Sequence, residues 1–297
     1  MKRLVVTLWI LLGSTTSVAQ ELLHGMDVQG NLFTVDLTTG AGTAIGVLEF
    51  SGSATLAGYN EIVHNPISNR SYAQERDGNF RLQPFDHITA AANGAAVDDD
   101  GSWHALEFVG DTLYGVYFTQ PGESNFATLN PNTGLPSDIA SFTLGVGVNV
   151  TGLAWNGAVL FAITNGGSAQ QGSATSSVLY EIDRLSGVTT EIGSTGMRAG
   201  GMSFGPDGQL YAGGSGSNRG QIWRIDTTTG AGTLLGASGF GQGQGNGIGG
   251  LMTADRSAPP PLPPRPRPTV DVPTLMTGAP GLIAALLLIG LLQLRRR

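Results

Sequence analysis

The chain has 297 residues, a net charge of −7, 46 glycines and no cysteine. Without cysteine it can form no disulfide, no thiolate-ligated zinc site and no thiol nucleophile. Residues 20–255 contain seven arginines, no lysine and 21 acidic residues, which gives them a net charge of −14. Because a phosphate backbone is bound by clustered cations, we expect no nucleic-acid partner.

The first 19 residues have the pattern of a signal peptide. Lys2 and Arg3 form a basic start, residues 4–12 are apolar, and residues 17–19 (Ser-Val-Ala) place small side chains around a cleavage site. The apolar stretch is shorter than a membrane-spanning helix requires. The pattern therefore predicts that residues 1–19 direct export and are then removed.

One hairpin pattern occurs three times in the following segment, at residues 31–46, 178–193 and 221–236. Each copy has an alternating strand, an aspartate, a turn that ends in Thr-Gly or Ser-Gly, and a second strand rich in Thr and aliphatic residues. We expect the aspartates to accept backbone N–H bonds of the turn and the glycines to adopt a positive φ. These turn residues are Asp36, Gly40, Asp183, Gly187, Asp226 and Gly230.

Two weaker copies complete the series. Residues 125–134 keep the pattern with Asn130 in place of the aspartate and Gly134 in the turn, and residues 79–88 keep part of it around Asp86. The five anchors are Asp36, Asp86, Asn130, Asp183 and Asp226, which are separated by 50, 44, 53 and 43 residues. A period of this length with four strands per repeat is typical of propeller blades.

The two ends of the repeat domain complement each other. Residues 22–27 resemble the second strand of a repeat, and residues 247–253 resemble the first strand. Pairing them would close a ring and leave no free sheet edge. We therefore predict an all-β fold for residues 20–255: a β-propeller of five four-stranded blades, or of six if the divergent stretch 51–101 contains an additional blade.

The repeat Val178-Leu-Tyr-Glu-Ile-Asp-Arg-Leu-Ser-Gly187 resembles the blades of a broad group of quinoprotein-like and surface propellers of bacteria. Some members of that group bind pyrroloquinoline quinone and oxidise alcohols. This body is short for that class and has neither adjacent cysteines nor a basic cluster. The resemblance therefore implies the hairpin and the fold, and we expect no cofactor and carry over no catalytic residue.

Residue types that bind metals form no motif in this chain. His24, His64, His87 and His104 lack metal-ligand spacing, so we interpret each as a strand or loop residue. Asp98–Asp100 precede a glycine and could hold Ca²⁺, but a distal glutamate at the required spacing is missing, so a solvated turn is favoured. The sequence predicts no metal site and no catalytic residue.

Two classes of function remain open. The first, which we favour, is a non-enzymatic binding module that presents its loops to a protein or glycan ligand. The second is a glycan-active hydrolase or lyase that uses the propeller funnel, with acids such as Glu107, Asp111 and Glu123, which lie near one another in the third repeat. An enzyme should gather two or more acids with perturbed pKa values, or a metal, at one mouth of the funnel.

The chain after the repeats has two parts. Residues 256–271 are rich in proline and predict an extended linker. Residues 275–294 carry no charge and as a helix would reach roughly the 30 Å of a bilayer core. Arg295, Arg296 and Arg297 follow directly, so the positive-inside bias predicts a cytoplasmic C-terminus and repeats on the other side of the membrane.

Val272-Pro273-Thr274-Leu275, the apolar segment and the terminal arginines together resemble the IPTL-CTERM sorting domain of Gram-negative bacteria. This domain is related to the PEP-CTERM signals that exosortase-type enzymes handle. Val272 stands where the family usually has Ile. The resemblance implies a protein anchored in the inner membrane and facing the periplasm, or one sorted to the outer membrane or cell surface, with or without cleavage near residue 272 by a processing enzyme.

Overall fold

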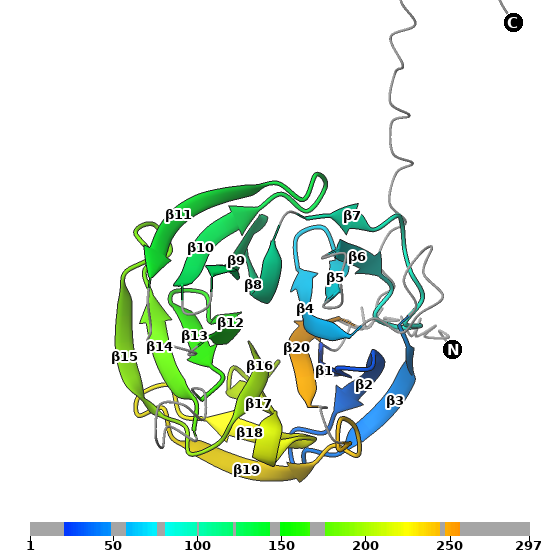
Figure 1. Cartoon of the computed structure of the whole chain (residues 1–297). Coiled ribbons are helices and arrows are strands. Elements are labelled where there is room, and N and C mark those ends of the chain that lie inside the picture. Colours follow the sequence, from blue (N-terminus) through cyan, green and yellow to red (C-terminus); the bar gives the residue numbers. More distant parts are fainter. Residues whose placement is uncertain are drawn as a thin grey trace, which may run out of the picture. The chain divides into compact units, whose positions relative to one another are not determined.

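The computed structural model describes residues 21–48, 58–75, 81–99, 101–120, 123–142, 149–166, 176–243 and 247–255. Their strands form five four-stranded antiparallel sheets arranged as the blades of a ring (Figure 1). The predicted all-β propeller with five blades is therefore confirmed. In these residues no helix has the length and apolarity needed to cross a membrane, and a 3₁₀ turn at Gly216–Asn218 is the one helical element that the blades contain.

The predicted signal peptide (1–19), the proline-rich linker (256–271) and the C-terminal segment lie outside the described residues. The same holds for the residues of the sorting motif, which are Val272, Pro273, Thr274, Leu275, Arg295, Arg296 and Arg297.

Each blade runs from an inner strand beside the ring axis to an outer strand at the rim (Figure 1). The first blade is β4 (Tyr59–Asn65), β5 (Arg70–Glu75), β6 (Arg81–Phe85) and β7 (Val97–Asp98), and the second is β8 (Ser102–Val109), β9 (Thr112–Gln120), β10 (Glu123–Leu129) and β11 (Pro136–Phe142). The third is β12 (Val150–Trp155), β13 (Leu160–Thr164), β14 (Val178–Ile182) and β15 (Thr189–Ser194), and the fourth is β16 (Ala199–Phe204), β17 (Leu210–Gly214), β18 (Gln221–Ile225) and β19 (Gly232–Ala237).

The fifth blade joins the two ends of the propeller. Its inner strand is β20 (Ile248–Ala254), followed outward by β1 (Leu22–Asp27), β2 (Asn31–Val35) and β3 (Gly42–Val47). β20 pairs antiparallel with β1, with Leu22 opposite Ala254 and Gly25 opposite Leu251. This is the predicted closure, and it pairs the strand edges that would otherwise stay open where the chain begins and ends.

The hydrophobic core lies between neighbouring blades. One buried cluster joins Met26 and Met252 of the fifth blade to Ile62 and Phe85 of the first. The second strands β13 and β17 are buried along their whole length, whereas the outer strands β3, β15 and β19 alternate between exposed and half-buried positions. Because this packing holds the blades together, the inner strands can present polar groups to the axis.

Candidate functional site in the central channel

Every inner strand has a register shift at the same place. In each blade, one residue near the start of the inner strand has no partner in the ladder, because its two neighbours pair with successive residues of the next strand. A β-bulge of this kind redirects a side chain from the regular alternation. The five bulge residues, Asn60, His104, Thr151, Gly200 and Gly249, all line one pocket at the start of the inner strands.

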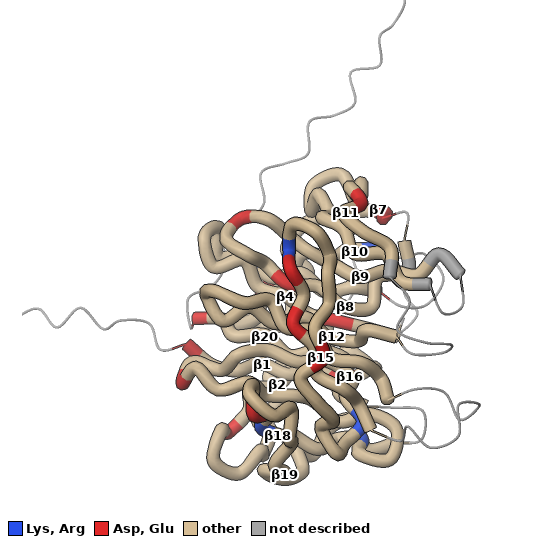
Figure 2. The backbone as a smooth tube through the Cα atoms, turned by 90° about the vertical axis from the view of Figure 1, so that its left-hand side faces the viewer, with Lys and Arg blue, Asp and Glu red and all other residues tan. Residues whose placement is uncertain are grey.

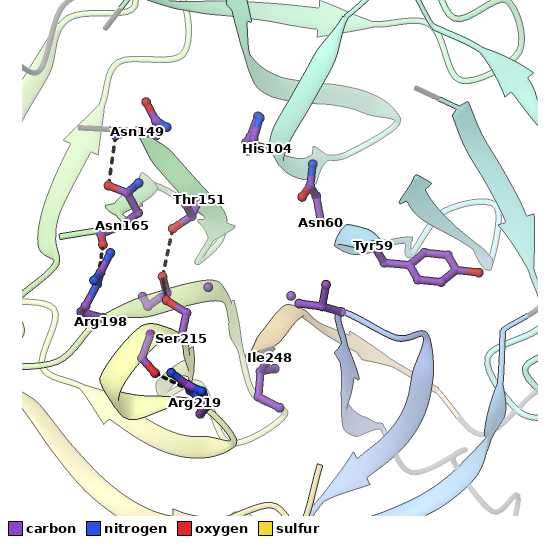
Figure 3. A pocket seen from close by; sticks show the side chains of 16 residues that line it. Tyr59, Asn60, His104, Asn149, Thr151, Asn165, Arg198, Ser215, Arg219 and Ile248 are labelled. Atoms are coloured by element: carbon purple, nitrogen blue, oxygen red, sulfur yellow. Dashed lines mark hydrogen bonds between the residues drawn. The ribbon is translucent and has the colours of Figure 1, made fainter. Parts of the chain in front are cut away.

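We call this pocket the mouth. It has a volume of about 360 Å³, which lies within the usual range of small-ligand sites. Its polar side chains surround the opening in Figure 3, whereas Tyr59 points away and donates its hydroxyl to the Leu48 carbonyl at 2.7 Å. They are Asn60, His104, Asn149, Thr151, Asn165, Arg198, Ser215 and Arg219. On the side where two bulges are glycines, the wall also includes Gly247.

The mouth contains two arginines and no acidic residue, although acidic positions dominate the rest of the domain (Figure 2). Backbone carbonyls hold both guanidinium groups: Arg198 Nε donates to Asn165 O at 3.2 Å, and Arg219 Nε donates to Gly216 O at 2.7 Å. Within the described part of the chain, neither forms an ion pair with a carboxylate. Their charges therefore remain available to a ligand.

Hydrogen bonds between blades fix the polar frame of the mouth. Asn60 Nδ2 donates to Trp103 O of the next inner strand at 3.0 Å, and Thr151 Oγ1 and Ser215 Oγ donate to Ala199 O at 3.4 and 2.9 Å. The last two bonds appear as dashed lines in Figure 3. Side chains held in this way lose little conformational entropy when a ligand binds, so the mouth is organised before binding.

Two carboxyl groups lie deeper in the channel. Residues 60 and 249 line the mouth and residues 62 and 251 line a second pocket at the other end of the inner strands, so Glu61 lies between the two pockets. Glu107 lines the second pocket. Burial raises the pKa of both carboxyls well above the ordinary value, and the charge of Glu107 raises that of Glu61 further.

Of the three acids suggested by sequence, Glu107 alone is shown to face the channel. Asp111 accepts a hydrogen bond from Asn65 Nδ2 at 2.7 Å in the turns below the inner strands, and Glu123 begins β10. Glu61, which sequence reasoning missed, is the second perturbed acid. The sequence does distinguish Glu61, because the equivalent residues of the other inner strands are small and uncharged: Ala105, Gly152, Gly201 and Gly250.

Three of the four histidines meet, although their spacing in sequence gave no sign of it. The ring of His87 lies edge-on to those of His24 and His64, with centroid distances of 5.4 and 5.2 Å. Ser71 Oγ lies 3.0 Å from Nδ1 of both His64 and His87. The described residues nevertheless contain no group of three side chains placed to hold a metal ion. His104 lies apart from the cluster, in the mouth.

The eight predicted turn residues lie in four equivalent hairpins, each between the third and fourth strands of a blade. Asp36 Oδ1 accepts the N–H groups of Thr38 and Thr39 at 2.8 and 2.9 Å, and the same arrangement recurs at Asn130, Asp183 and Asp226. Gly40, Gly134, Gly187 and Gly230 have φ values of 72, 74, 71 and 78°. In the first blade, Ala90 takes the same position at φ 60°. These hairpins lie away from the mouth.

The acidic run Asp98–Asp100 differs in part from the solvated turn that was expected. Asp98 is exposed at the end of β7, whereas Asp99 is buried at 6% exposure. Asp100 lies outside the described residues.

Comparison with known proteins supports the fold but gives no information about the site. No protein-family model matches the chain, and no curated protein matches it in sequence. A chain in a crystal structure of a nidogen/laminin complex is similar with a TM-score of 0.52 and 8% identity, over 80% of this chain and 100% of that one. A protein assigned as TolB from Agrobacterium tumefaciens has a TM-score of 0.42 and 15% identity, over 75% and 72%. The first similarity shows a shared fold and says nothing of function. The second is too distant to support any inference.

Proposed function

We propose that this propeller is a non-enzymatic binding module whose mouth holds a carboxylated sugar unit of a glycan. The observation that carries the proposal is the pair Arg198 and Arg219, which have no acidic partner among the described residues although the domain has a net charge of −14. Arginine binds carboxylates through charge-assisted and often bidentate hydrogen bonds. The amide and hydroxyl groups of Asn60, Thr151 and Ser215 suit the hydroxyls of a sugar ring.

The acidic surface gives this mouth selectivity. Anions without matching hydrogen-bond geometry are repelled by the domain as a whole, whereas a ligand that reaches both arginines gains two local attractions in a partly desolvated pocket. The volume of about 360 Å³ accommodates one sugar unit rather than a long chain. We therefore propose recognition of a chain end or a side branch.

A hydrolase remains the alternative because of the acid pair Glu61 and Glu107. Glycoside hydrolysis needs one ionised and one protonated carboxyl on either side of the scissile bond. Here burial raises the pKa of both acids, and Glu61 is only 1% exposed. Because neither acid lines the mouth, the geometry favours binding over catalysis.

Calorimetric titration with a glucuronic acid oligosaccharide tests the binding proposal. Arg198→Gln and Arg219→Gln should each weaken binding about 10- to 100-fold, since a hydrogen bond to a charged group contributes about 1.5–3 kcal/mol. Arg224→Gln is the matched control, because Arg224 is exposed on β18, outside the mouth. Equal binding of a neutral glucose oligosaccharide, preference for an acidic peptide, or hydrolysis of the titrant would each refute the proposal.

We also propose that the module works outside the cytoplasm, held to a membrane by residues 272–297. The supporting features are the signal-peptide pattern of residues 1–19, the uncharged stretch 275–294 and the final three arginines. Cell fractionation tests this location. Full-length protein should pellet with membranes, and a chain that lacks residues 272–297 should be released. A truncated chain that still pellets and resists alkaline carbonate would show that the anchor lies elsewhere.

A further inference from the structure

The second pocket of the channel, which we call the lower chamber, combines a half-buried acid, Glu107, with an apolar wall. It has a volume of about 220 Å³ and lies at the ends of the inner strands, opposite the mouth. Its wall includes the aromatic residues Trp155 and Phe204 together with Met252, and its titratable residues are Glu107 and His64. Ser203 and Thr253 add hydroxyl groups that donate to the Phe204 carbonyl, at 3.2 and 2.6 Å.

The carboxyl groups in and beside this chamber have no positively charged partner within the described residues. Glu61 Oε1 accepts the Ile62 N–H at 3.1 Å, but Oε2 is buried without a hydrogen-bond partner. Neither Glu61 nor Glu107 forms an ion pair with an arginine there. The two carboxyls are close enough for their charges to interact. A buried carboxyl that lacks a partner costs free energy, and a cation in the chamber would supply that partner.

The imidazoles of His64 and His24 do not supply the missing charge. His64 lies on the chamber wall, with His24, His87 and Asp255 behind it. Burial lowers the pKa of His64 to about 4, as it does for His24, so both are neutral near pH 7. The other inner strands bring no titratable side chain to the wall.

The wall favours an organic cation over a metal ion. A metal ion would need several oxygen or nitrogen ligands, and the described residues contain no group of three such side chains. Aromatic rings and a thioether instead suit the methyl and methylene groups of an ammonium ion, which aromatic faces attract electrostatically. Trp155 already makes one such contact, with the Arg184 guanidinium 5.7 Å from its ring centroid. The small volume excludes a sugar chain and fits a molecule of the size of ethanolamine or choline.

We propose that the lower chamber binds a small organic ammonium ion, with Glu107 as its counter-ion and Glu61 as a second negative charge behind it. Burial raises the pKa of Glu61 and Glu107 well above the ordinary value, and a bound cation favours their ionised form, so binding releases protons and becomes tighter as pH rises. This site is independent of the mouth and of the ligand proposed there.

Calorimetry on the full-length chain tests the proposal, with choline chloride as the probe and 3,3-dimethylbutan-1-ol as its neutral isostere. Choline should bind, the isostere should bind at least 10-fold more weakly, and choline should bind more tightly at pH 8 than at pH 6. The heat measured in buffers of different ionisation enthalpy should show proton release at pH 6.

Two variants separate the proposed role of the acids from general effects on the fold. Glu107→Gln should weaken choline binding at least 10-fold and abolish its pH dependence, whereas Glu191→Gln, at an exposed position of β15, should change neither. Because glutamine resembles the protonated form of this half-buried acid, Glu107→Gln should fold, which a thermal melt verifies. Equal binding of choline and its isostere, unchanged binding by Glu107→Gln, or a preference for Ca²⁺ would overturn the proposal.

Discussion

At the scale of single residues, the propeller buries ionisable groups that oppose each other in their response to pH. His24 and His64 are held neutral by burial, with pKa values lowered from 6.5 to about 4. Burial raises the pKa values of Glu61 and Glu107 well above 4.5, which favours their neutral forms. A histidine whose pKa is lowered by folding reduces stability as the pH falls. A carboxyl whose pKa is raised by folding reduces stability as the pH rises. We therefore expect stability to be greatest over a narrow range of pH.

The acid side of this range depends on the histidine cluster. Between pH 6.5 and about 4 the unfolded chain takes up protons at His24 and His64 that the folded chain does not, so the free energy of unfolding decreases as pH falls. Replacing His24 by Gln removes one of these two histidines. The loss of free energy of unfolding over this pH range should then be smaller than in the parent, by a few kcal/mol at most. Urea denaturation at pH 4.5, 5.5 and 6.5 measures it. His104→Gln, outside the cluster, should leave the slope unchanged, and an equal effect of both variants would contradict the assignment.

The alkaline side depends on Glu61. Above pH 4.5 the unfolded chain releases this proton while the folded chain keeps it, so the free energy of unfolding decreases as pH rises. Glu61→Gln removes the ionisation and should raise the free energy of unfolding at pH 8 by about 1–3 kcal/mol, the usual desolvation cost of a buried polar group without a partner. A variant less stable than the parent at pH 8 would show that the carboxylate is stabilised by a partner.

At the scale of the hairpin, one repeated sequence provides both a turn and the contact between neighbouring blades. In the fourth and fifth blades the turn glycine lies against a glycine in the outer strand of the preceding blade: Gly230 faces Gly193, and Gly40 faces Gly236. In the third blade, Gly187 lies against Ala140 of the preceding blade in the same way. A methyl group added at Gly230 would lie 2.5 Å from Gly193 O. Because both glycines belong to the same 16-residue pattern, each copy of the pattern supplies one half of two contacts. This explains why the sequence was sufficient to predict the blades.

Substitution of two glycines separates backbone strain from this contact. Gly230 and Gly208 have φ values of 78 and 74°, but nothing lies within 4 Å of a methyl group added at Gly208. Gly208→Ala should therefore cost about 1–2 kcal/mol from the left-handed conformation alone. Gly230→Ala should cost about 1–3 kcal/mol more, from overpacking against the neighbouring blade. Urea midpoints of both variants measure the difference. Equal losses of stability would show that the neighbouring blade accommodates the added methyl group without cost.

Other features of the elements could not be read from the sequence. The bulges that form the mouth each add one unpaired residue to an inner strand, and no residue type marks that position, because it is Asn, His, Thr or Gly in different blades. The histidine cluster depends on contacts between distant parts of the chain: His87 Nε2 lies 2.8 Å from Asp255 O, 168 residues away. Local pattern therefore predicted the hairpins and the number of blades, and long-range packing decided which polar residues meet in the channel.

At the scale of the whole molecule, stability depends on the strand that closes the ring. β20 pairs with β1 and buries Ile248, Leu251 and Met252 against its neighbours. It also carries Thr253, whose hydroxyl donates to Phe204 O of the fourth blade at 2.6 Å, and it leads to Asp255, whose carbonyl contacts the histidine cluster. The last nine described residues therefore contact three blades. Without them, no strand would pair with the inner edge of β1 and the ring would not be closed.

Two truncations test whether this closure is required. A chain that ends at Asp255 keeps all described strands and the closure of the ring, so it should unfold in one cooperative transition. A chain that ends at residue 246 lacks β20, exposes the edge of β1 and leaves buried apolar groups of three blades without partners, so it should lose cooperative unfolding and become sensitive to proteases. Circular dichroism melts and limited proteolysis compare the two. Cooperative unfolding of the shorter chain at the same temperature would show that the four complete blades maintain the ring without the closing strand. The mouth would then have to form without Gly247 and Gly249.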